Sequence, residues 1–503
     1  MALSAEAVQV LRELNPWWTK PGAVRPEPPP YRRRLVVDLL GRLRRPRGVI
    51  EVVRGPRQVG KTTGIHQIIQ DLMRSGTRPR DILFVRFDLE LLREEPAALR
   101  SILTWFENEV RQRPFGSGRP SYVFLDEVHK LRRWHEDVKH VGDTYPLRML
   151  LTGSSSVLMA RGGRESLAGR VFTTELPAFS FREVLECWRP KLARVLPPAI
   201  PFGEVFEGGL VAGSRVFDAL KPRHKQSIRR ALEHYYARGG YPRLHSGEVD
   251  EDRWADYLVQ TVFDNVLGAD IPDLFPVESP QLLRHLYLAV ARLTGQEIAQ
   301  MKLAENATVA GIPTNQPTVG KYLHYLADAL LIREFRRYPL AKKASARVPA
   351  KITVSDLGVR NAIFRGAPSL WKSDPQILGP LVETLVQGVI RDHNLQVHFY
   401  REHEDPKDRR SRQHEVDFVA ERVDGSVLPV EVKFRKRIDA VDLDGLRYFM
   451  RKFESPSGVV VTRDLSRWDA TERILYIPLQ SLWPSCSPGI RRLSRGPAQT
   501  DVR

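Results

Sequence analysis

Short apolar runs alternate with helical patterns from Val49 to about Phe181. The runs VIEVV, DILFVRF, SYVFLD and RMLLTG are each bounded by turn or cap residues. Near-continuous apolar strands separated by helices are typical of a parallel β-sheet covered on both faces. We therefore expect residues 49–188 to form an α/β domain. Residues 1–48, which mix a short helix with a Pro-rich stretch, are expected to form an N-terminal arm that packs on a domain.

The pattern changes after this domain. Residues 189–226 contain the run LPPAIPFGEVFEGGLVAG, whose Pro, Gly and Ala content indicates a linker or an insertion. Residues 227–340 have a helical pattern throughout. Within them, helices expected at Gln296–Ala307 and Gln316–Ala329 are joined by a Gly-Ile-Pro-Thr turn, which is compatible with a helix-turn-helix.

The strand pattern returns over residues 341–483, where ITVSD, QVHFYRE, EVDFVAE, LPVEVKF, GVVVT and ILYIP are interleaved with helices. This alternation predicts a second α/β domain. Residues 484–503 are rich in Ser, Pro and Arg, and we expect them to form a loose tail.

The charge balance indicates an anionic partner. Lys and Arg exceed Asp and Glu by 78 − 60 = 18 in the 503 residues, and nucleic acid is the commonest anionic polymer. An Arg-rich composition without a partner is the alternative. The two cysteines, Cys187 and Cys486, form no CxxC or Cys/His pattern, which argues against a disulfide framework and a zinc site. No apolar run approaches the ~20 residues that span a bilayer, so we expect a cytoplasmic protein outside the membrane.

A glycine-rich segment follows the first strand and precedes a helix, and it fits G-x-x-x-x-G-K-[ST]. In such a segment the backbone N–H groups face phosphates, Lys61 reaches the β- and γ-phosphate oxygens, and Thr62 can ligate Mg²⁺. We therefore predict an ATP and Mg²⁺ site that includes Gly55, Pro56, Arg57, Gln58, Val59, Gly60, Lys61, Thr62 and Thr63.

Two adjacent acids end the strand SYVFLD and complete this prediction. Asp126 would hold the magnesium shell and Glu127 would polarise the attacking water, although two acids are also common at a helix N-terminus. The next strand ends in hydroxyl groups, and Thr152 and Ser154 are candidates to sense the γ-phosphate or the water; an ordinary helix N-cap is the alternative. Beyond them, Arg170 is the favoured arginine finger for the site of a neighbouring subunit, against the simpler reading of a solvated face.

Carboxylates and a lysine gather in the last third of the chain. Glu383 falls on a predicted helix and Asp417 on the strand EVDFV, while Glu431 and Lys433 share one face of the strand PVEVK. Hard oxygen ligands suit Mg²⁺, and clustered carboxylates with a metal lower the barrier to phosphodiester hydrolysis. These residues predict a magnesium-dependent phosphodiesterase site; for Glu431 and Lys433 a plain edge-strand charge pair is the alternative.

Basic residues flank these carboxylates on both sides. Such a cluster would grip a phosphate backbone without reading sequence, and a solvated hairpin tip is the alternative. The predicted helix-turn-helix offers only Lys321, His324 and Tyr325 as outward polar groups, which supports groove reading weakly. We therefore expect backbone contacts to DNA from Lys407, Arg409, Arg410, Arg412, Arg435, Lys436 and Arg437.

Several motifs occur together along most of the chain: NPWW, GPRQVGKTT, VFLDEVHKL, LLTGSSS, LAGR-x5-LPAFSFREVL, RGGYPR, SDLGVRNAIF, VETLVQ, HEVDFV and PVEVKF. In this combination the chain resembles the prokaryotic AAA-type ATP-binding proteins that carry a C-terminal restriction-endonuclease-like domain. The resemblance implies an AAA-type ATPase core, a winged-helix middle and a C-terminal PD-(D/E)xK fold. The long insertion between about Pro190 and Gln226 departs from the pattern.

The resemblance also implies roles for the second site. Asp417 and Glu431, with Glu383, would surround Mg²⁺, and Lys433 would orient or activate water. The resulting hypothesis is an ATP-hydrolysing DNA-processing protein in which the ATPase is coupled to a DNA-binding, nuclease-like domain. The alternative is a nucleotide-switched DNA- or protein-binding regulator with an inactive nuclease fold. An ATP site completed by a neighbour's arginine favours a homo-oligomer.

Overall fold

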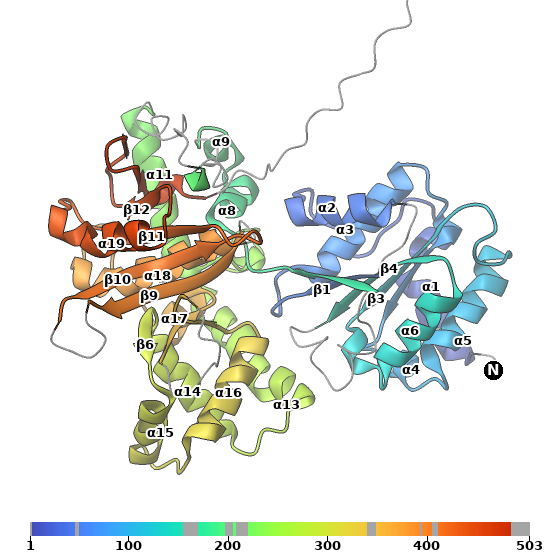
Figure 1. Cartoon of the computed structure of the whole chain (residues 1–503). Coiled ribbons are helices and arrows are strands. Elements are labelled where there is room, and N and C mark those ends of the chain that lie inside the picture. The colour runs from blue at the N-terminus through green and yellow to red at the C-terminus, as the bar shows by residue number, and fades with distance from the viewer. Residues whose placement is uncertain are drawn as a thin grey trace, which may run out of the picture. The chain divides into compact units, whose positions relative to one another are not determined.

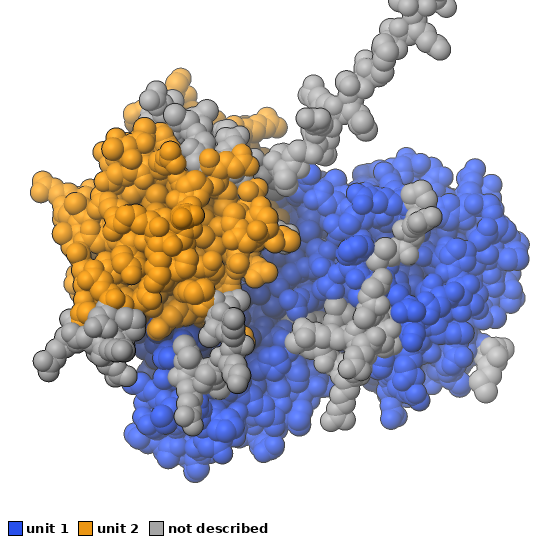
Figure 2. Space-filling view, viewed as in Figure 1, with its two compact units in different colours: residues 1–179, 234–334, 343–367 blue, residues 180–233, 335–342, 368–503 orange. Residues whose placement is uncertain are grey.

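The computed structural model describes residues 3–45, 50–153, 170–196, 205–207, 220–339, 349–392, 395–404 and 411–483. The predicted tail and most of the predicted insertion lie outside these residues. The chain divides into two compact units whose segments interleave (Figure 2). Unit 1 comprises residues 1–179, 234–334 and 343–367, and unit 2 comprises residues 180–233, 335–342 and 368–503. The unit limits therefore do not follow the limits that the sequence suggests.

The first part of unit 1 is built on a parallel sheet of five strands in the order β2-β3-β4-β1-β5 (Figure 1). The predicted apolar runs form four of them: β1 (Ile50–Arg54), β2 (Ile82–Arg86), β3 (Ser121–Asp126) and β4 (Leu147–Gly153). The edge strand β5 (Val171–Glu175) was not predicted, because none of its residues is buried and its sequence VFTTE has only two apolar residues. The predicted parallel sheet is confirmed.

The helices that alternate with these strands along the chain pack on the sheet. They are α2 (Arg34–Leu43), α3 (Lys61–Arg74), α4 (Glu90–Arg93), α5 (Ala98–Trp105) with the continuing turn Phe106–Arg111, and α6 (Trp134–Thr144). The core beneath them contains fully buried side chains such as Val52, Leu83, Val123 and Leu151. These side chains come from neighbouring strands, which is why their sequences read as continuous apolar runs.

The NPWW motif fastens the N-terminal arm to the edge of this sheet. Its Asn15 directly follows α1 (Ala5–Leu14), and its other three residues form the short helix η1 (Pro16–Trp18). The buried Asn15 side chain accepts a hydrogen bond from the Phe84 N–H and donates one to the Phe84 carbonyl, at 2.7 and 2.8 Å. Both tryptophan indoles donate to the Ile82 carbonyl. The arm thus satisfies backbone groups that the edge strand β2 would otherwise leave unpaired.

A helical segment follows in unit 1. It contains α12 (Trp254–Tyr257), two π-helical stretches, η7 (Leu258–Asp264) and η8 (Val266–Asp270), and α13 (Ile271–Leu274). The π-helical hydrogen bonding changes the direction in which successive side chains point. This segment carries Asp270, which pairs with the loop after β1, and Asp273, which pairs with Lys130 after β3.

The middle of the chain differs from its predicted helical pattern. In order come α14 (Pro280–Arg292), β6 (Gln296–Ile298), α15 (Gln300–Val309), α16 (Gln316–Asp328), β7 (Ile332–Phe335) and β8 (Ala350–Val354). The three strands form one sheet in the order β6-β8-β7. The prediction of helix from Gln296 was wrong there, and the run ITVSD pairs with β6 instead of joining the second α/β domain. A three-residue strand is too short to give a periodic signal.

Unit 2 contains a mixed sheet of six strands in the order β13-β14-β12-β11-β10-β9. Strands β9 (Gln396–His403), β10 (Gln413–Glu421) and β11 (Val427–Lys433) are antiparallel to one another. Strands β12 (Gly458–Thr462) and β14 (Ile474–Pro478) continue the sheet in parallel with β11. Strand β13 (Arg467–Asp469) pairs antiparallel with β14 at the edge. Helices α18 (Pro375–Asp392) and α19 (Asp444–Lys452) pack against β10 and β11. Within the described residues, no helix is long and apolar enough to cross a membrane.

The remaining described helices of unit 2 are α8 (Phe181–Trp188), α9 (Pro190–Ala193) and most of α11 (Pro222–Arg238). Helix α8 begins with a capping box, in which the Ser180 hydroxyl accepts from the Glu183 N–H and the Glu183 carboxylate accepts from the Ser180 N–H. Helix α17 (Leu357–Ile363) belongs to unit 1, where the buried Asn361 amide donates to the Tyr236 carbonyl.

Candidate functional sites

The loop between β1 and α3 has the backbone shape of a phosphate cradle. Gln58 and Gly60 have positive φ angles of 61° and 93°, which turn successive N–H groups toward one side. A Cβ on Gly55 would lie 2.3 Å from the Leu176 carbonyl oxygen, so only glycine fits there. Because α3 begins directly after Gly60, its N-terminal dipole favours an anion at the same place.

Lys61 and Thr62 point from the start of α3 toward this cradle. The Lys61 ammonium donates to the Gly55 and Pro56 carbonyls at 2.9 and 3.0 Å. The Thr62 hydroxyl donates to an Asp126 carboxylate oxygen at 2.7 Å. Val59 is buried beneath the loop, and Thr63 follows on α3 and is half-buried.

Asp126 occupies the carboxyl end of β3, where parallel strands present their ends to a ligand. It is 1% exposed and accepts hydrogen bonds from Thr62 and Thr152. Burial and the neighbouring Glu127 charge raise the pKa of Asp126, and the two hydroxyl donors oppose that rise. A hard carboxylate beside a threonine hydroxyl fits the magnesium shell that a P-loop nucleotide brings.

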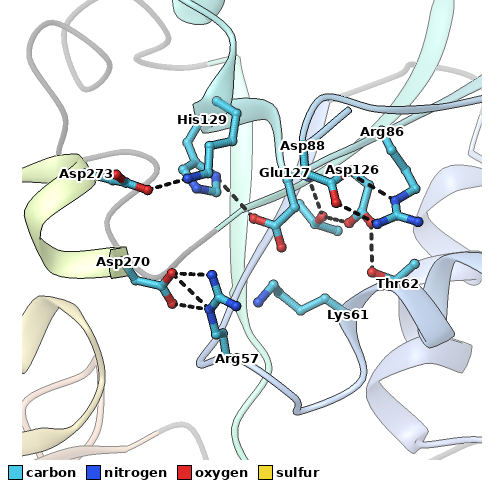
Figure 3. Close-up of polar contacts among 12 residues, drawn as sticks. Arg57, Lys61, Thr62, Arg86, Asp88, Asp126, Glu127, His129, Asp270 and Asp273 are labelled. Carbon is cyan, nitrogen blue, oxygen red and sulfur yellow. Dashed lines mark hydrogen bonds and ion pairs between the residues drawn. The ribbon is translucent and has the colours of Figure 1, made fainter. Parts of the chain in front are cut away.

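Glu127 follows with a left-handed backbone, φ 52°. Its N–H donates to the Thr152 hydroxyl at 3.3 Å, and one of its carboxylate oxygens lies 3.4 Å from Nδ1 of His129. Burial lowers the pKa of His129 to about 4, so its ring is neutral at neutral pH. His129 was not among the predicted site residues, although it lies only two positions beyond Glu127 (Figure 3).

Two acids of the helical segment form ion pairs with the nucleotide domain. Asp270 accepts a bidentate ion pair from Arg57, with the closest nitrogen–oxygen distance at 2.6 Å. Asp273, one turn further along, accepts from Lys130 (Figure 3). No sequence signal indicated these contacts, because 213 positions separate Arg57 from Asp270.

Arg170 lies at the opposite end of the strands from the phosphate loop. It directly precedes β5, which pairs in parallel with β1, so Arg170 sits beside the start of β1 while the phosphate loop follows its end. Its guanidinium pairs with the exposed Asp143. Arg170 therefore does not face the nucleotide site of its own chain. Its role as an arginine finger for the site of a neighbouring subunit stays a prediction. Ser154 lies outside the described residues.

The second predicted site brings three of its four residues together. Asp417 on β10 lies opposite Glu431 on β11. The Asp417 carboxylate accepts from the Val432 N–H at 2.8 Å, and the Asp417 N–H donates to Glu431 at 3.4 Å. The Lys433 ammonium donates to the other Glu431 oxygen.

A β-bulge positions Asp417. Relative to β9, the register of β10 shifts between Val416 and Val419, so that two residues of β10 span one residue of β9. A bulge re-aims a side chain and raises the local twist, and bulges are common beside active sites. The sequence EVDFV gives no sign of this shift.

The charges at this site are tightly linked. Asp417 and Glu431 are 8% and 4% exposed. Burial, together with the Asp417 charge, raises the pKa of Glu431 well above its usual range. Burial lowers the pKa of Lys433, but the charges of Glu431 and Asp417 outweigh it and the net shift is upward. A divalent cation would relieve this repulsion between two carboxylates.

The role of Glu383 as a third carboxylate of this site stays a prediction. Glu383 lies on α18, which packs against β10 and β11. In the part of the chain that the structure describes, no group of three or more His, Cys, Asp or Glu side chains is arranged to hold a metal ion. Asp417 and Glu431 are the two predicted carboxylates that the structure places side by side here.

The predicted DNA contacts differ in their surroundings. Arg412 pairs with Asp444, and Arg435 pairs with Asp442. Lys436 and Arg437 are exposed beyond β11. Lys407, Arg409 and Arg410 lie outside the described residues. Lys436 and Arg437 are thus the exposed cations nearest in sequence to Lys433.

Comparison with known proteins divides the chain into three matched segments. Residues 48–185 match an AAA domain. Residues 229–369 match a domain of unknown function, DUF8612, and residues 378–482 match another, DUF4143.

The relatives that match over most of this chain are uncharacterized proteins. An uncharacterized protein of Haemophilus influenzae is 22% identical over 311 residues, which is 62% of this chain and 68% of that protein. An uncharacterized protein of Methanocaldococcus jannaschii is 22% identical over 372 residues, which is 74% of this chain and 71% of that protein. Among solved structures, the Walker-type ATPase PABY2304 of Pyrococcus abyssi aligns with a TM-score of 0.40 and 15% identity, covering 68% of this chain and 99% of that one. The AAA match over residues 48–185 coincides with the parallel sheet, the phosphate loop and the Asp126–Glu127 pair, so this part of the chain is similar to an AAA-type P-loop domain.

Proposed function

We propose that the protein hydrolyses ATP at the site between β1 and β3 and couples that reaction to DNA. Lys61 binds the β- and γ-phosphates, Thr62 and Asp126 hold Mg²⁺, and Glu127 orients the attacking water, with Thr152 fixing both acids. The direct Thr62–Asp126 hydrogen bond carries this proposal. It sets the hydroxyl and the carboxylate side by side, as the shell of one magnesium ion requires.

Steady-state phosphate release tests the ATPase assignment. Lys61→Ala should abolish turnover, because it removes the ammonium that balances the phosphate charge. Glu127→Gln should keep ATP binding and lose turnover, since it keeps the shape of the side chain and removes its charge. Lys139→Ala, at an exposed position on α6, is the matched control and should turn over normally. Undiminished turnover in Lys61→Ala would contradict the assignment.

For unit 2 we propose magnesium-dependent cleavage of DNA. Asp417 and Glu431 would hold the metal and Lys433 would activate or orient water. The buried Asp417–Glu431 pair beside the Lys433 ammonium supports this, since burying two acids together costs stability unless a cation compensates them. The metal would polarise the phosphodiester and lower the pKa of its bound water.

Nuclease assays on single-stranded, duplex and branched DNA test the second site. Asp417→Asn and Lys433→Gln should each abolish magnesium-dependent cleavage and leave ATP turnover intact. Lys452→Gln, at an exposed lysine on α19, is the control and should cut normally. If the wild type cuts no substrate with Mg²⁺ or Mn²⁺, the nucleotide-switched regulator becomes the better description.

DNA binding itself has a separate signature. Each phosphate contact releases counterions, so affinity should fall steeply with salt, with a slope of about −0.9 per neutralised phosphate on a log–log scale. If Lys436 and Arg437 both contact phosphates, replacing both by Gln should make the slope less negative by the contribution of about two phosphates. A salt dependence equal to that of the wild type would remove these residues from the interface.

A further inference from the structure

Arg57 is the one charged side chain of the loop segment 55–60, between β1 and the start of α3. It lies within the curve of the loop, two positions beyond Gly55. Figure 3 shows its guanidinium and the Lys61 ammonium directed toward the same space, with the Glu127 carboxylate on the far side. The Glu127 charge also acts on Arg57 and helps raise its pKa, together with the larger effect of Asp270. Arg57 therefore lies in the space between Lys61 and Glu127, which is where the proposed ATP site would hold the γ-phosphate.

Asp270 at present holds this guanidinium. Arg57 Nε lies 2.9 and 2.7 Å from the two carboxylate oxygens, and Nη2 lies 2.6 Å from one of them. Such a bidentate pair fixes the plane of the guanidinium as well as its position. Asp270 is 14% exposed and Arg57 is 42% exposed, so the pair is open to competition from the solvent side.

A γ-phosphate offers Arg57 a better anion than a carboxylate. It presents three oxygens and nearly twice the charge, and planar guanidinium binds phosphate bidentately. ADP has no such group, and its β-phosphate is held deeper in the loop by the backbone N–H groups and Lys61. An arginine at this position thus responds to the third phosphate and to neither of the first two.

We propose that Arg57 distinguishes ATP from ADP by exchanging Asp270 for the γ-phosphate, which releases the segment that carries Asp270 from the phosphate loop. The proposal rests on the proposed ATP site. Asp270 ends η8 and is the N-cap residue of α13, so its release frees a short helical segment that otherwise contacts the loop. Binding of ATP would thereby change the contacts of the helical part of unit 1 with the phosphate loop.

The chain contains a matched control for this exchange. Lys130 and Asp273 form a second ion pair between the nucleotide domain and the same short helix. Lys130 follows β3 on η4 (Val128–Lys130) and is not part of the loop. Loss of this pair removes a similar contact without freeing any side chain of the loop.

Equilibrium binding of ATPγS and ADP, each with Mg²⁺, tests the exchange in the full-length chain. Asp270→Asn should tighten ATPγS binding by about fivefold, as expected from removing a partly exposed ion pair of about 1 kcal/mol, and should leave ADP binding unchanged. Arg57→Gln should reduce the preference for ATPγS over ADP. In the double variant Arg57→Gln/Asp270→Asn, the effect of Asp270→Asn should disappear. Asp273→Asn should bind both nucleotides as the wild type does.

Hydrogen exchange supplies a second readout. In the wild type, ATPγS should accelerate exchange in the segment 266–274 relative to ADP, and Arg57→Gln should not show this difference. Weaker ATPγS binding in Asp270→Asn would show that Asp270 positions Arg57 for the phosphate, and unchanged binding would show a purely structural ion pair; either result overturns the exchange. If the wild type binds neither nucleotide, the ATP site itself is refuted, which separates the two failures.

Discussion

The sharpest stability test lies in the N-terminal arm, at Asn15. Its side chain is fully buried and pairs with both backbone groups of Phe84 on the edge strand β2. In Asn15→Ala the Phe84 N–H and carbonyl lose these partners. A buried unsatisfied polar group costs about 1–3 kcal/mol, so the loss should be about 2–6 kcal/mol, less where water enters.

Hydrogen exchange measures this locally. A loss of about 3 kcal/mol corresponds to about a 10²-fold faster exchange of the β2 amides when they exchange through opening of the arm. Thermal unfolding should shift downward by about 6 °C, at about 2 °C per kcal/mol for a large domain. Thr19→Ala is the control, because the Thr19 hydroxyl is exposed and bonds only to the nearby Pro16 carbonyl. If the β2 amides exchange at the same rate in Asn15→Ala and in Thr19→Ala, the arm does not complete the edge of the sheet.

Gly55→Ala should abolish nucleotide binding measured by calorimetry, since its new Cβ would lie 2.3 Å from a backbone carbonyl oxygen; normal affinity would refute the tight loop. Asp81→Ala should destabilise the protein by about 3–5 kcal/mol in denaturant unfolding because Arg111 is left buried and uncompensated, whereas Asp88→Ala at an exposed pair should cost under about 1 kcal/mol. Burial lowers the pKa of His66 from 6.5 to about 4. Between these two pH values the unfolded chain binds a proton at His66 and the folded chain does not. The folded state is therefore destabilised as the pH falls from 6.5 toward 4, and this effect is absent above pH 6.5. His66→Leu should therefore reduce the fall in Tm between about pH 7 and about pH 5, and an unchanged fall would contradict this.

The nucleotide site could be predicted because its parts are local. The loop from Gly55 to Thr62 is contiguous, and Asp126 ends an apolar run that forms a parallel strand. Parallel strands in one sheet present their carboxyl ends at the same edge, so loop and acid must meet there. The contact between Thr62 and Asp126 follows from that geometry.

The second site could be predicted only in part. The spacing of Glu431 and Lys433 on one strand placed them on one face, which holds in the structure. The pairing of Asp417 with Glu431 depends on the register of two antiparallel strands and on a bulge, and neither is encoded in a local pattern. For Glu383 the sequence predicted only a position on a helix, and it did not predict the distance between that helix and the sheet.

The sequence by itself determined the α/β character of both ends of the chain, the phosphate loop and the identity of its acids. Periodicity and turn chemistry act over neighbouring residues, and that range is sufficient for strands, helices and contiguous loops. Only the tertiary structure decided that β8 joins β6, that Arg170 lies at the opposite end of the strands from the phosphate loop, and that Asp270 holds Arg57. These contacts join residues far apart in the chain, and they are fixed by sheet order, register and packing rather than by any local pattern.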